Sequence, residues 1–301
     1  MNIDPALYPF EHHYLDRNGL RYHYVDEGRG LPVVMLHGNP TWSFYYRNLV
    51  QELSSDHRTI VPDHIGCGFS DKPGDDRYEY TLNSRVDDLE ALLDHLGIHR
   101  DITLVLHDWG GMIGMAFATR YPERIRRLVV LNTSAFLLPP KKAFPAALWL
   151  VRNTPLGPLL VRGFNAFSWT AAQICCKRRP LSRVLKKAYT APYRNWADRI
   201  ATLRFVQDIP LAPGDPAYAI CEDVERNAAQ FRDRPMLICW GEKDFVFSTE
   251  FLDRWTETFP QAEVHRWPDG GHYILEDASD EILKLVRQFL AEHPLEVAAA
   301  S

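Results

Sequence analysis

Short apolar runs alternate with helix-like segments along most of this chain, and this alternation constrains the fold more than any other feature. Six runs read as strands: PVVMLHGNP, RTIVPDHIG, ITLVLHDWG, RRLVVLNTS, RPMLICWGEKD and AEVHRWPDGGH. In all of them except AEVHRWPDGGH, apolar residues follow one another without polar alternation, which is typical of parallel strands covered on both faces. The intervening segment LNSRVDDLEALLDHLG has apolar residues at helical spacing. The sequence therefore predicts an α/β fold with a mostly parallel, doubly wound sheet.

This alternation stops after LNTSAF. From about residue 137 to residue 230 the sequence is helix-like, rich in aromatic residues, proline and basic residues, and it has no strand-like run. An insertion between two strands of such a sheet most often lies over the carboxyl ends of the strands, where these folds bind ligands. We therefore expect a core made of residues 1–136 and 231–301, with a helical lid made of residues 137–230.

Charge is distributed unevenly between these two parts. The net charge is −5, yet the segment from Lys141 to Arg204 contains thirteen Lys and Arg residues and a single acid, Asp198. Thirteen minus one gives +12 on this segment, which leaves −17 on the remainder. The basic segment predicts either docking onto another enzyme or an anionic membrane, or closure onto the acidic core by charge complementarity.

The sequence also predicts a cytoplasmic protein without a cofactor. Its first residues show no basic region followed by an apolar run, and no uncharged apolar stretch reaches the roughly 18 residues that span a membrane. No nucleotide-binding glycine pattern is present. We expect no cofactor, no metal and no nucleic-acid partner, and the basic segment is the part that would contact the periphery of a membrane. The five cysteines lack zinc-ligand spacing and fit reduced thiols in the cytosol: Cys67, Cys175, Cys176, Cys221 and Cys239.

The stretch LVLHDWGGMIG places an acid at a sharp turn. Asp108 follows an apolar strand and precedes Gly110 and Gly111, the pattern with which a strand, a tight turn and a helix expose a nucleophile. Serine enzymes built this way carry Ser at that position and Gly where this chain has Leu106. An alternative is that Asp108 only caps the following helix. As a nucleophile, a carboxylate would need no activating base because it is ionised at neutral pH.

Two residues downstream complete a catalytic pattern. Asp244 follows the strand-like run in CWGEKDFVF, and His272 lies in the loop of WPDGGHYILED. Hydrolase triads of this type run nucleophile, acid, base along the chain. Taken alone, His272 reads as a surface histidine and Asp244 as a solvated loop acid. Their order and their positions after strands predict that Asp108, Asp244 and His272 form a triad.

A pair of hydrogen-bond donors is expected beside the nucleophile. In hydrolases with this arrangement, one backbone N–H of the oxyanion hole comes from the turn after the first strong strand, and the other comes from the residue after the nucleophile. Here those residues are Asn39, in HGNPTW, and Trp109. Their amide and indole N–H groups are donors as well, so the side chains could hold an anion together. Alternatively, Asn39 is an ordinary turn residue before Pro40.

Several motifs carry a family resemblance across nearly the whole chain. HGNPTW, PDHIGCGFSDKP, HDWGGMIG, WGEKD and GGHYILED together resemble the α/β-hydrolase fold enzymes of the haloalkane dehalogenase group. Asp followed by Trp-Gly-Gly at the turn separates that group from serine esterases and lipases. The resemblance implies that Asp108 attacks carbon and that His272 activates water. It also implies that Asn39 and Trp109 hold the departing anion.

The acid of the triad varies within this group. In some members it follows the strand that precedes the lid. In this chain that strand ends in Asn132, so we expect Asp244 to take the role.

The lid narrows the resemblance further. FNAFS and AYTAPYRNWADRIATLRFVQDIPL, with SRVDDL and HYILED, are most similar to the β-lactone decarboxylases of bacterial long-chain olefin biosynthesis. Those enzymes convert a cis-3,4-dialkyl-β-lactone to a cis-alkene and CO2. The resemblance implies a long-chain hydrophobic small-molecule substrate and other enzymes of the olefin pathway as partners. Asp108 would open the lactone either at the ring C–O carbon or at the carbonyl.

Other activities use the same residues. A haloalkane dehalogenase would release halide hydrolytically through an aspartyl ester, and an epoxide hydrolase would protonate its substrate with two lid tyrosines, for which Tyr189 and Tyr193 are available. A non-catalytic binding protein is disfavoured because every triad position is filled. Three lid residues are candidates for lining the pocket, namely Trp149, Trp169 and Trp196.

Overall fold

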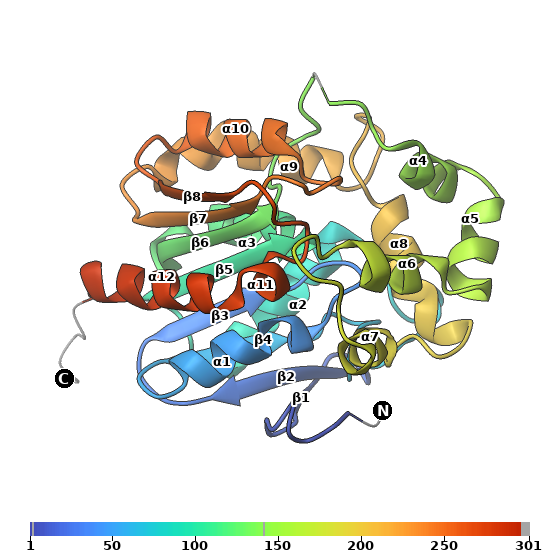
Figure 1. The fold of residues 1–301 in the computed structure, drawn as a ribbon, viewed down its shortest axis with the longest axis horizontal. Helices are drawn as coiled ribbons and strands as arrows, with labels where there is room; N and C mark the ends of the chain where they lie inside the picture. Colours follow the sequence, from blue (N-terminus) through green and yellow to red (C-terminus); the bar gives the residue numbers. More distant parts are fainter. Residues whose placement is uncertain (2, 141, 296–301) are drawn as a thin grey trace.

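An eight-stranded sheet forms the centre of the computed structural model, which describes residues 1, 3–140 and 142–295 (Figure 1). The strand order is β1-β2-β4-β3-β5-β6-β7-β8. The β1–β2 and β2–β4 pairs are antiparallel, and the other neighbouring pairs are parallel. The strands are β1 (His13–Asp16), β2 (Arg21–Glu27), β3 (Pro32–Leu36), β4 (Arg58–Pro62), β5 (Ile102–Asp108), β6 (Ile125–Thr133), β7 (Met236–Gly241) and β8 (Glu263–Trp267).

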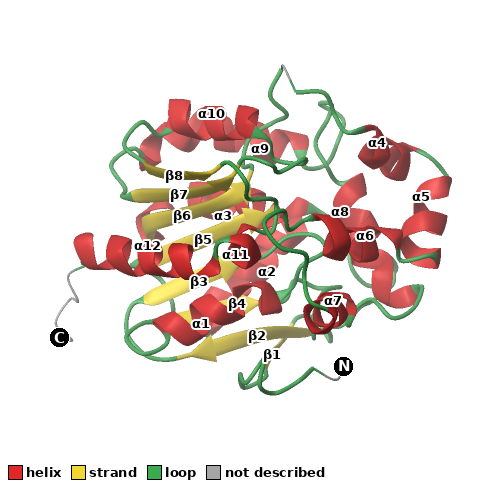
Figure 2. Cartoon of the chain, in the orientation of Figure 1, coloured by secondary structure: helices red, strands yellow, loops and turns green. Residues whose placement is uncertain are grey.

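Helices cover both faces of the sheet, as Figure 2 shows, and the predicted doubly wound α/β class is confirmed. Leu104 and Leu106 of β5 pack into one apolar cluster, and Val105 packs into the other. The run of uninterrupted apolar residues thus reflects burial on two sides. The core helices are α1 (Arg47–Leu53), α2 (Leu82–His95), α3 (Trp109–Arg120), α10 (Thr249–Thr258), α11 (Ile274–Asp277) and α12 (Ser279–Glu292), with the 3-10 turns η1 (Ser43–Tyr46) and η2 (Pro122–Arg124).

The helices between β6 and β7 gather beyond the carboxyl ends of the parallel strands (Figure 1). One of them, α9, returns to pack against α3 of the core. The division of the chain at residues 137 and 230 stays a prediction. These helices are α4 (Ala146–Asn153), α5 (Leu156–Pro158), the π-helix η3 (Leu159–Gly163), α6 (Ala166–Ile174), α7 (Arg183–Thr190), η4 (Ala197–Arg199), α8 (Ile200–Gln207), α9 (Tyr218–Asn227) and η5 (Ala228–Phe231).

Ion pairs join this helical insertion to the core. Arg178 contacts Asp269 at 2.9 Å and Glu281 at 2.6 Å, and Arg204 contacts Asp75 at 2.5 Å. Part of the basic excess is therefore used for charge complementarity with the acidic core. Among the described residues, no helix has the length and hydrophobicity of a transmembrane span.

Candidate active site

Asp108 lies at the turn between β5 and α3 in a backbone conformation that side chains rarely adopt. Its φ is +52° and its ψ is −126°. A Cβ atom on Gly110 would lie 1.9 Å from the carbonyl oxygen of Leu36, so only glycine allows α3 to begin this close to β3. The Asp108 side chain does not cap α3. This strained strand–turn–helix geometry is the one that exposes a nucleophile, and it speaks against the capping alternative.

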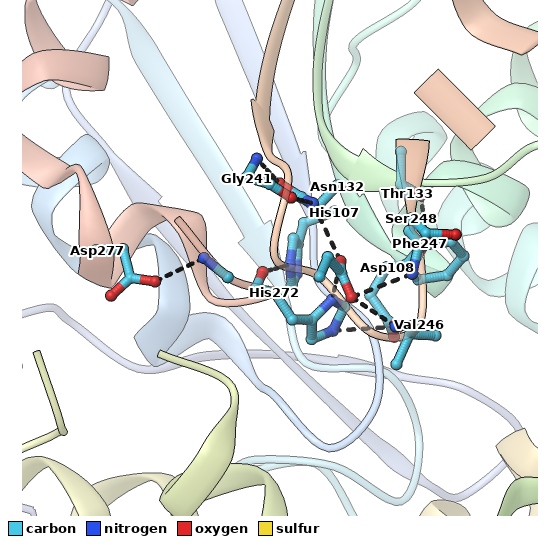
Figure 3. A network of polar contacts seen from close by, with 12 residues as sticks. His107, Asp108, Asn132, Thr133, Gly241, Val246, Phe247, Ser248, His272 and Asp277 are labelled. Carbon is cyan, nitrogen blue, oxygen red and sulfur yellow. Dashed lines mark hydrogen bonds and ion pairs between the residues drawn. The ribbon is translucent and has the colours of Figure 1, made fainter. Parts of the chain in front are cut away.

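The three predicted triad residues meet at the carboxyl edge of the sheet, and Figure 3 shows two of them, Asp108 and His272, side by side. Nδ1 of His272 lies 2.8 Å from Oδ2 of Asp244, and Nε2 lies 3.5 Å from Oδ2 of Asp108. All three side chains are buried. The imidazole therefore lies between two carboxylates, with one nitrogen directed at each.

Burial and charge act in opposite directions on these groups. Burial raises the pKa of Asp108 above its usual value, although His272 and the backbone N–H groups of Asn39 and Trp109 oppose the rise. Burial lowers the pKa of His272, but Asp244 and Asp108 together outweigh it, so this pKa is raised. The site consequently favours the imidazolium form of His272 more than water does.

Asn132, which the sequence marks only as the end of a strand, holds the acid in place. Its Nδ2 donates to Oδ2 of Asp244 and to the carbonyl oxygen of Gly241, both at 3.0 Å. Its Oδ1 accepts from Gly241 N at 2.8 Å. The other carboxylate oxygen of Asp244 accepts from the backbone N–H groups of Val246 and Phe247. The Asp244 carboxylate is therefore fixed on both sides and aimed at the imidazole.

A second histidine, His107, contacts the loop that carries His272 and holds it in position. His107, the residue before Asp108, lies with Nε2 at 2.8 Å from the carbonyl oxygen of His272. Burial and the nearby His272 lower the pKa of His107 well below its usual value, so its ring is neutral and Nε2–H donates. The position of His107 on β5 was visible in the sequence, but no local pattern indicated its contact with a residue so far along the chain.

Asn39 and Trp109 lie beside Asp108, but their side chains have different surroundings, and their role in holding an anion stays a prediction. The backbone N–H of Asn39 donates to Oδ1 of Asp108 at 2.5 Å. Its side-chain Nδ2 donates to the carbonyl oxygen of Thr202 on α8, at 3.0 Å. The amide group carries a second hydrogen on Nδ2, which remains available. Trp109 lines the cavity described below, and its indole N–H has no acceptor in the part of the chain that the structure describes.

A buried arginine links α8 to the core behind Trp109. Phe205 of α8 packs against Trp109, with ring centroids 5.3 Å apart. The guanidinium of Arg85 lies 3.7 Å from the centroid of Phe205, and its Nη1 lies 3.3 Å from Oδ2 of Asp208. Arg85 is fully buried, and burial raises the pKa of Asp208 to about 6. Helix α8, which contacts both Asn39 and Trp109, is thus anchored to the core by a buried ion pair.

An apolar cavity of about 520 Å3 extends from Asp108 and His272 into the helical insertion. Its lining is almost entirely apolar. Such a cavity accommodates a hydrophobic ligand and offers few partners for water. The lid residues on its wall include Leu148, Leu150, Val151, Leu160, Val161, Phe167, Thr170, Ile174 and Val206.

The aromatic candidates of the lid lie elsewhere. Trp149, Trp169 and Trp196 are exposed, and none of them lines the cavity. Tyr189 donates to Glu276, and Tyr193 donates to the carbonyl oxygen of Thr41. Neither tyrosine lines the cavity, so the described residues provide no tyrosine pair for an epoxide.

The residues that could bind a metal ion are acids, histidines and cysteines. Within residues 1, 3–140 and 142–295, no group of three or more His, Cys, Asp or Glu residues could hold a metal ion. All five cysteines are free. The expectation that the protein needs no metal or cofactor stays a prediction.

Comparison with known proteins places this geometry in a family. A family model described as the alpha/beta hydrolase fold matches residues 32–279. The chain belongs to the α/β-hydrolase fold family. A protein of Shewanella oneidensis named cis-3-alkyl-4-alkyloxetan-2-one decarboxylase is 59% identical over 287 residues, which cover 95% of this chain and 90% of the relative. A protein of the same name from Xanthomonas campestris is 48% identical, with 93% and 95% coverage.

Solved structures of α/β hydrolases support the same assignment. The haloalkane dehalogenase DatA from Agrobacterium tumefaciens superposes with a TM-score of 0.85 at 26% identity, covering 97% of this chain and all of that one. The predicted α/β-hydrolase fold, the place in the dehalogenase-like group and the prediction of an enzyme are confirmed.

Proposed function

We propose that this protein is a β-lactone decarboxylase that converts a cis-3-alkyl-4-alkyloxetan-2-one to a cis-alkene and CO2. The observation that carries the proposal is the carboxylate–imidazole–carboxylate arrangement at the base of an apolar cavity. Two relatives named for this activity, at 59% and 48% identity, support it. Asp108 is the nucleophile, His272 the proton-bearing partner and Asp244 the acid that orients it.

In the first step, an oxygen of the Asp108 carboxylate attacks ring carbon 4. The bond between that carbon and the ring oxygen breaks, and its electron pair remains on the released carboxylate. The product is an aspartyl alkyl ester with a carboxylate on the neighbouring carbon. No base is needed, which is the chemical reason for an aspartate at a position where related enzymes carry serine.

In the second step, the bond between carbon 3 and the carboxylate breaks. Its electron pair forms the double bond, the ester C–O bond breaks, and Asp108 regains its negative charge as CO2 leaves. The first step inverts carbon 4, and an anti elimination then yields the cis-alkene from the cis-lactone. Attack at the carbonyl would instead leave an alkoxide at carbon 4, and alkene formation would require oxide or hydroxide to depart from it. The chemistry therefore favours attack at carbon 4.

Three groups stabilise the charges in these steps. The second Nδ2 hydrogen of Asn39 and the indole N–H of Trp109 are available for the carboxylate that ring opening releases. Fixed donors in a site that excludes water are worth about 3 kcal/mol each in the transition state. The imidazolium of His272 faces Asp108 and favours its departure as a carboxylate.

A haloalkane dehalogenase is the alternative that uses the same residues. Its second step needs a water molecule activated by neutral His272, whereas decarboxylation consumes no water. The apolar cavity supports the water-free route. The absence of tyrosines from the cavity wall, among the described residues, counts against an epoxide hydrolase.

The substrate class has consequences for location and delivery. We propose that residues 137–230 act as the lid that admits a long-chain, water-insoluble lactone, in a protein of the cytoplasm. Such a substrate would arrive from another enzyme of the same pathway or from a membrane. The basic lid is the surface that would meet either source.

The proposal is tested by supplying the purified protein and its Asp108→Ala variant with a cis-dialkyl-β-lactone and, separately, with 1-bromobutane. Gas chromatography follows alkene and ion chromatography follows bromide. Alkene without bromide, lost in the variant, is expected. Fast bromide release without alkene would contradict the proposal and favour the dehalogenase.

A further inference from the structure

Exposed apolar side chains concentrate on the lid. Of the eleven large apolar residues that are exposed in the described chain, eight lie between residues 149 and 196. Exposed apolar residues gathered in one region of a protein mark contact with a partner or a membrane. The eight are Trp149, Leu156, Leu159, Phe164, Trp169, Ile174, Val184 and Trp196.

One part of the lid combines such side chains with unpaired cations. Helices α6 and α7 pack against each other in the lid (Figure 1). Trp169 of α6 is 60% exposed, and Val184 of α7 is 56% exposed. We call this surface the α6–α7 face. Four cations are exposed on α7 and on the loop that joins it to α6, namely Lys177, Arg179, Arg183 and Lys187, and we include them in the α6–α7 face.

These four cations differ from the lid residues that bind acids of the core. Arg178 and Arg204 are paired with acids of the core, as described above. Within residues 1, 3–140 and 142–295, the side chains of Lys177, Arg179, Arg183 and Lys187 form no ion pair with an acid. Charge complementarity with the core therefore explains part of the basic excess and leaves these four charges facing outward.

The cavity opens at the border of the α6–α7 face. Ile174 and Phe245 line the cavity that reaches Asp108, yet they are 39% and 43% exposed. The ammonium group of Lys177 lies 5.7 Å from the centroid of the Phe245 ring. Apolar side chains at the opening are thus bordered by a cation, and the route from this face to Asp108 has apolar walls.

We propose that the α6–α7 face docks on an anionic lipid bilayer and takes up the lactone directly from it. Trp169, Val184 and Ile174 would enter the interfacial region, while the four cations bind lipid phosphates. The centre of a protein–protein interface is depleted of charged residues, whereas a mixture of aromatic residues and unpaired cations suits a bilayer surface. The identity of the cargo rests on the proposed function, but the docking itself does not.

The test compares two variants with the same change of charge. The face variant combines Lys177→Glu, Arg179→Glu, Arg183→Glu and Lys187→Glu. The control variant combines Arg29→Glu, Arg100→Glu, Arg126→Glu and Lys284→Glu, all at exposed positions of the core. Both are sedimented with phosphatidylcholine vesicles that either contain or lack phosphatidylglycerol.

We expect the wild type and the control variant to bind the anionic vesicles and the face variant to bind at least about tenfold more weakly. Trp169→Ser is expected to weaken binding without altering its dependence on salt. Equal binding of the two charge variants, or no binding of the wild type, would overturn the proposal. The second result is also the one expected if the face binds a protein instead.

Activity separates this proposal from the proposed function. The face variant is expected to convert a detergent-dispersed lactone at the wild-type rate and a vesicle-embedded lactone several-fold more slowly. Loss of vesicle binding in a protein that converts neither lactone would support docking while contradicting the decarboxylase. Equal rates for face and control variants on vesicle-embedded lactone would overturn delivery from the bilayer.

Discussion

Around Asp108, polar groups at the carboxyl edge of the sheet pair with one another in a buried network, whereas the lid presents apolar side chains to the cavity and unpaired cations to the outside. The network fixes a reaction that needs a carboxylate, an imidazole and an acid at defined positions. The lid sets the size and polarity of the molecule that reaches them. Dehalogenases and decarboxylases can therefore share the first region while differing in substrate through the second.

The largest loss of activity is expected from a substitution in the buried network around Asp108. Asp108→Asn removes the charged nucleophile and should lower kcat at least about 1000-fold for every lactone, whatever its chain length. Asp253→Asn, at an exposed position of α10, is the matched control and should retain full activity. Substantial alkene formation by the Asp108 variant would show that Asp108 is not the nucleophile and that the buried network is not the catalytic part of the molecule.

Arg85 joins the two regions and tests how independent they are. Arg85→Met leaves Asp208 buried without its partner and should cost about 3 to 5 kcal/mol of unfolding free energy at pH 8. The pKa of Asp208 is about 6, above its value in the unfolded chain, so the folded state takes up a proton as the pH falls and the loss should shrink at pH 5. Urea unfolding at both pH values measures this. The same loss at both would show that charge at Asp208 is not the cause.

A substitution at Asn132 tests how much the hydrogen bond that holds Asp244 in place contributes to catalysis. Asn132→Gly accommodates the positive φ of this residue and removes only its hydrogen bonds to Asp244 and Gly241. We expect a loss of about 2 kcal/mol in unfolding free energy and a lower kcat with an unchanged KM. A raised KM with normal kcat would place Asn132 with substrate binding instead.

The pH dependence of activity distinguishes the two possible fates of the aspartyl ester, decarboxylative elimination and hydrolysis. The pKa of His272 is raised, and the decarboxylase uses its imidazolium, so alkene formation should fall about tenfold per pH unit above that pKa. It should also fall at acid pH as Asp108, whose pKa is raised by burial, becomes protonated. A hydrolytic enzyme needs neutral His272 and would instead lose activity as the pH falls through the same pKa. His272→Gln should abolish the alkaline limb.

A substitution in the lid is expected to alter only the preference for substrate chain length. Ala166→Phe narrows the cavity and is expected to lower kcat/KM for long-chain lactones about tenfold while leaving short-chain lactones unaffected. Ala146→Phe, on the exposed side of α4, is the control. An equal loss with both chain lengths would show that the lid also shapes the network.

The sequence predicted the parts of this molecule that depend on local patterns. The six runs predicted as strands correspond to β3 to β8, and the positions of Asp108, Asp244 and His272 follow from the rule that parallel strands bring their carboxyl ends to one edge. The antiparallel strands β1 and β2 were not predicted, because neither contains an uninterrupted apolar run. The contacts of Asn132 with Asp244 and of His107 with His272 join residues more than 100 positions apart, and no local pattern encodes them. The bond from Asn39 to Thr202 depends on how the lid docks. The outward position of the lid tryptophans likewise required the structure.

The most direct test of the central claim follows the oxygen atoms of Asp108. The enzyme is allowed to turn over a cis-dialkyl-β-lactone in water labelled with heavy oxygen, and the peptide that contains Asp108 is then weighed by mass spectrometry. Decarboxylative elimination returns Asp108 with its original oxygens, so unlabelled peptide together with cis-alkene and CO2 is the predicted result. Heavy oxygen in Asp108, accompanied by a hydroxy acid, would show hydrolysis of the aspartyl ester and contradict the account.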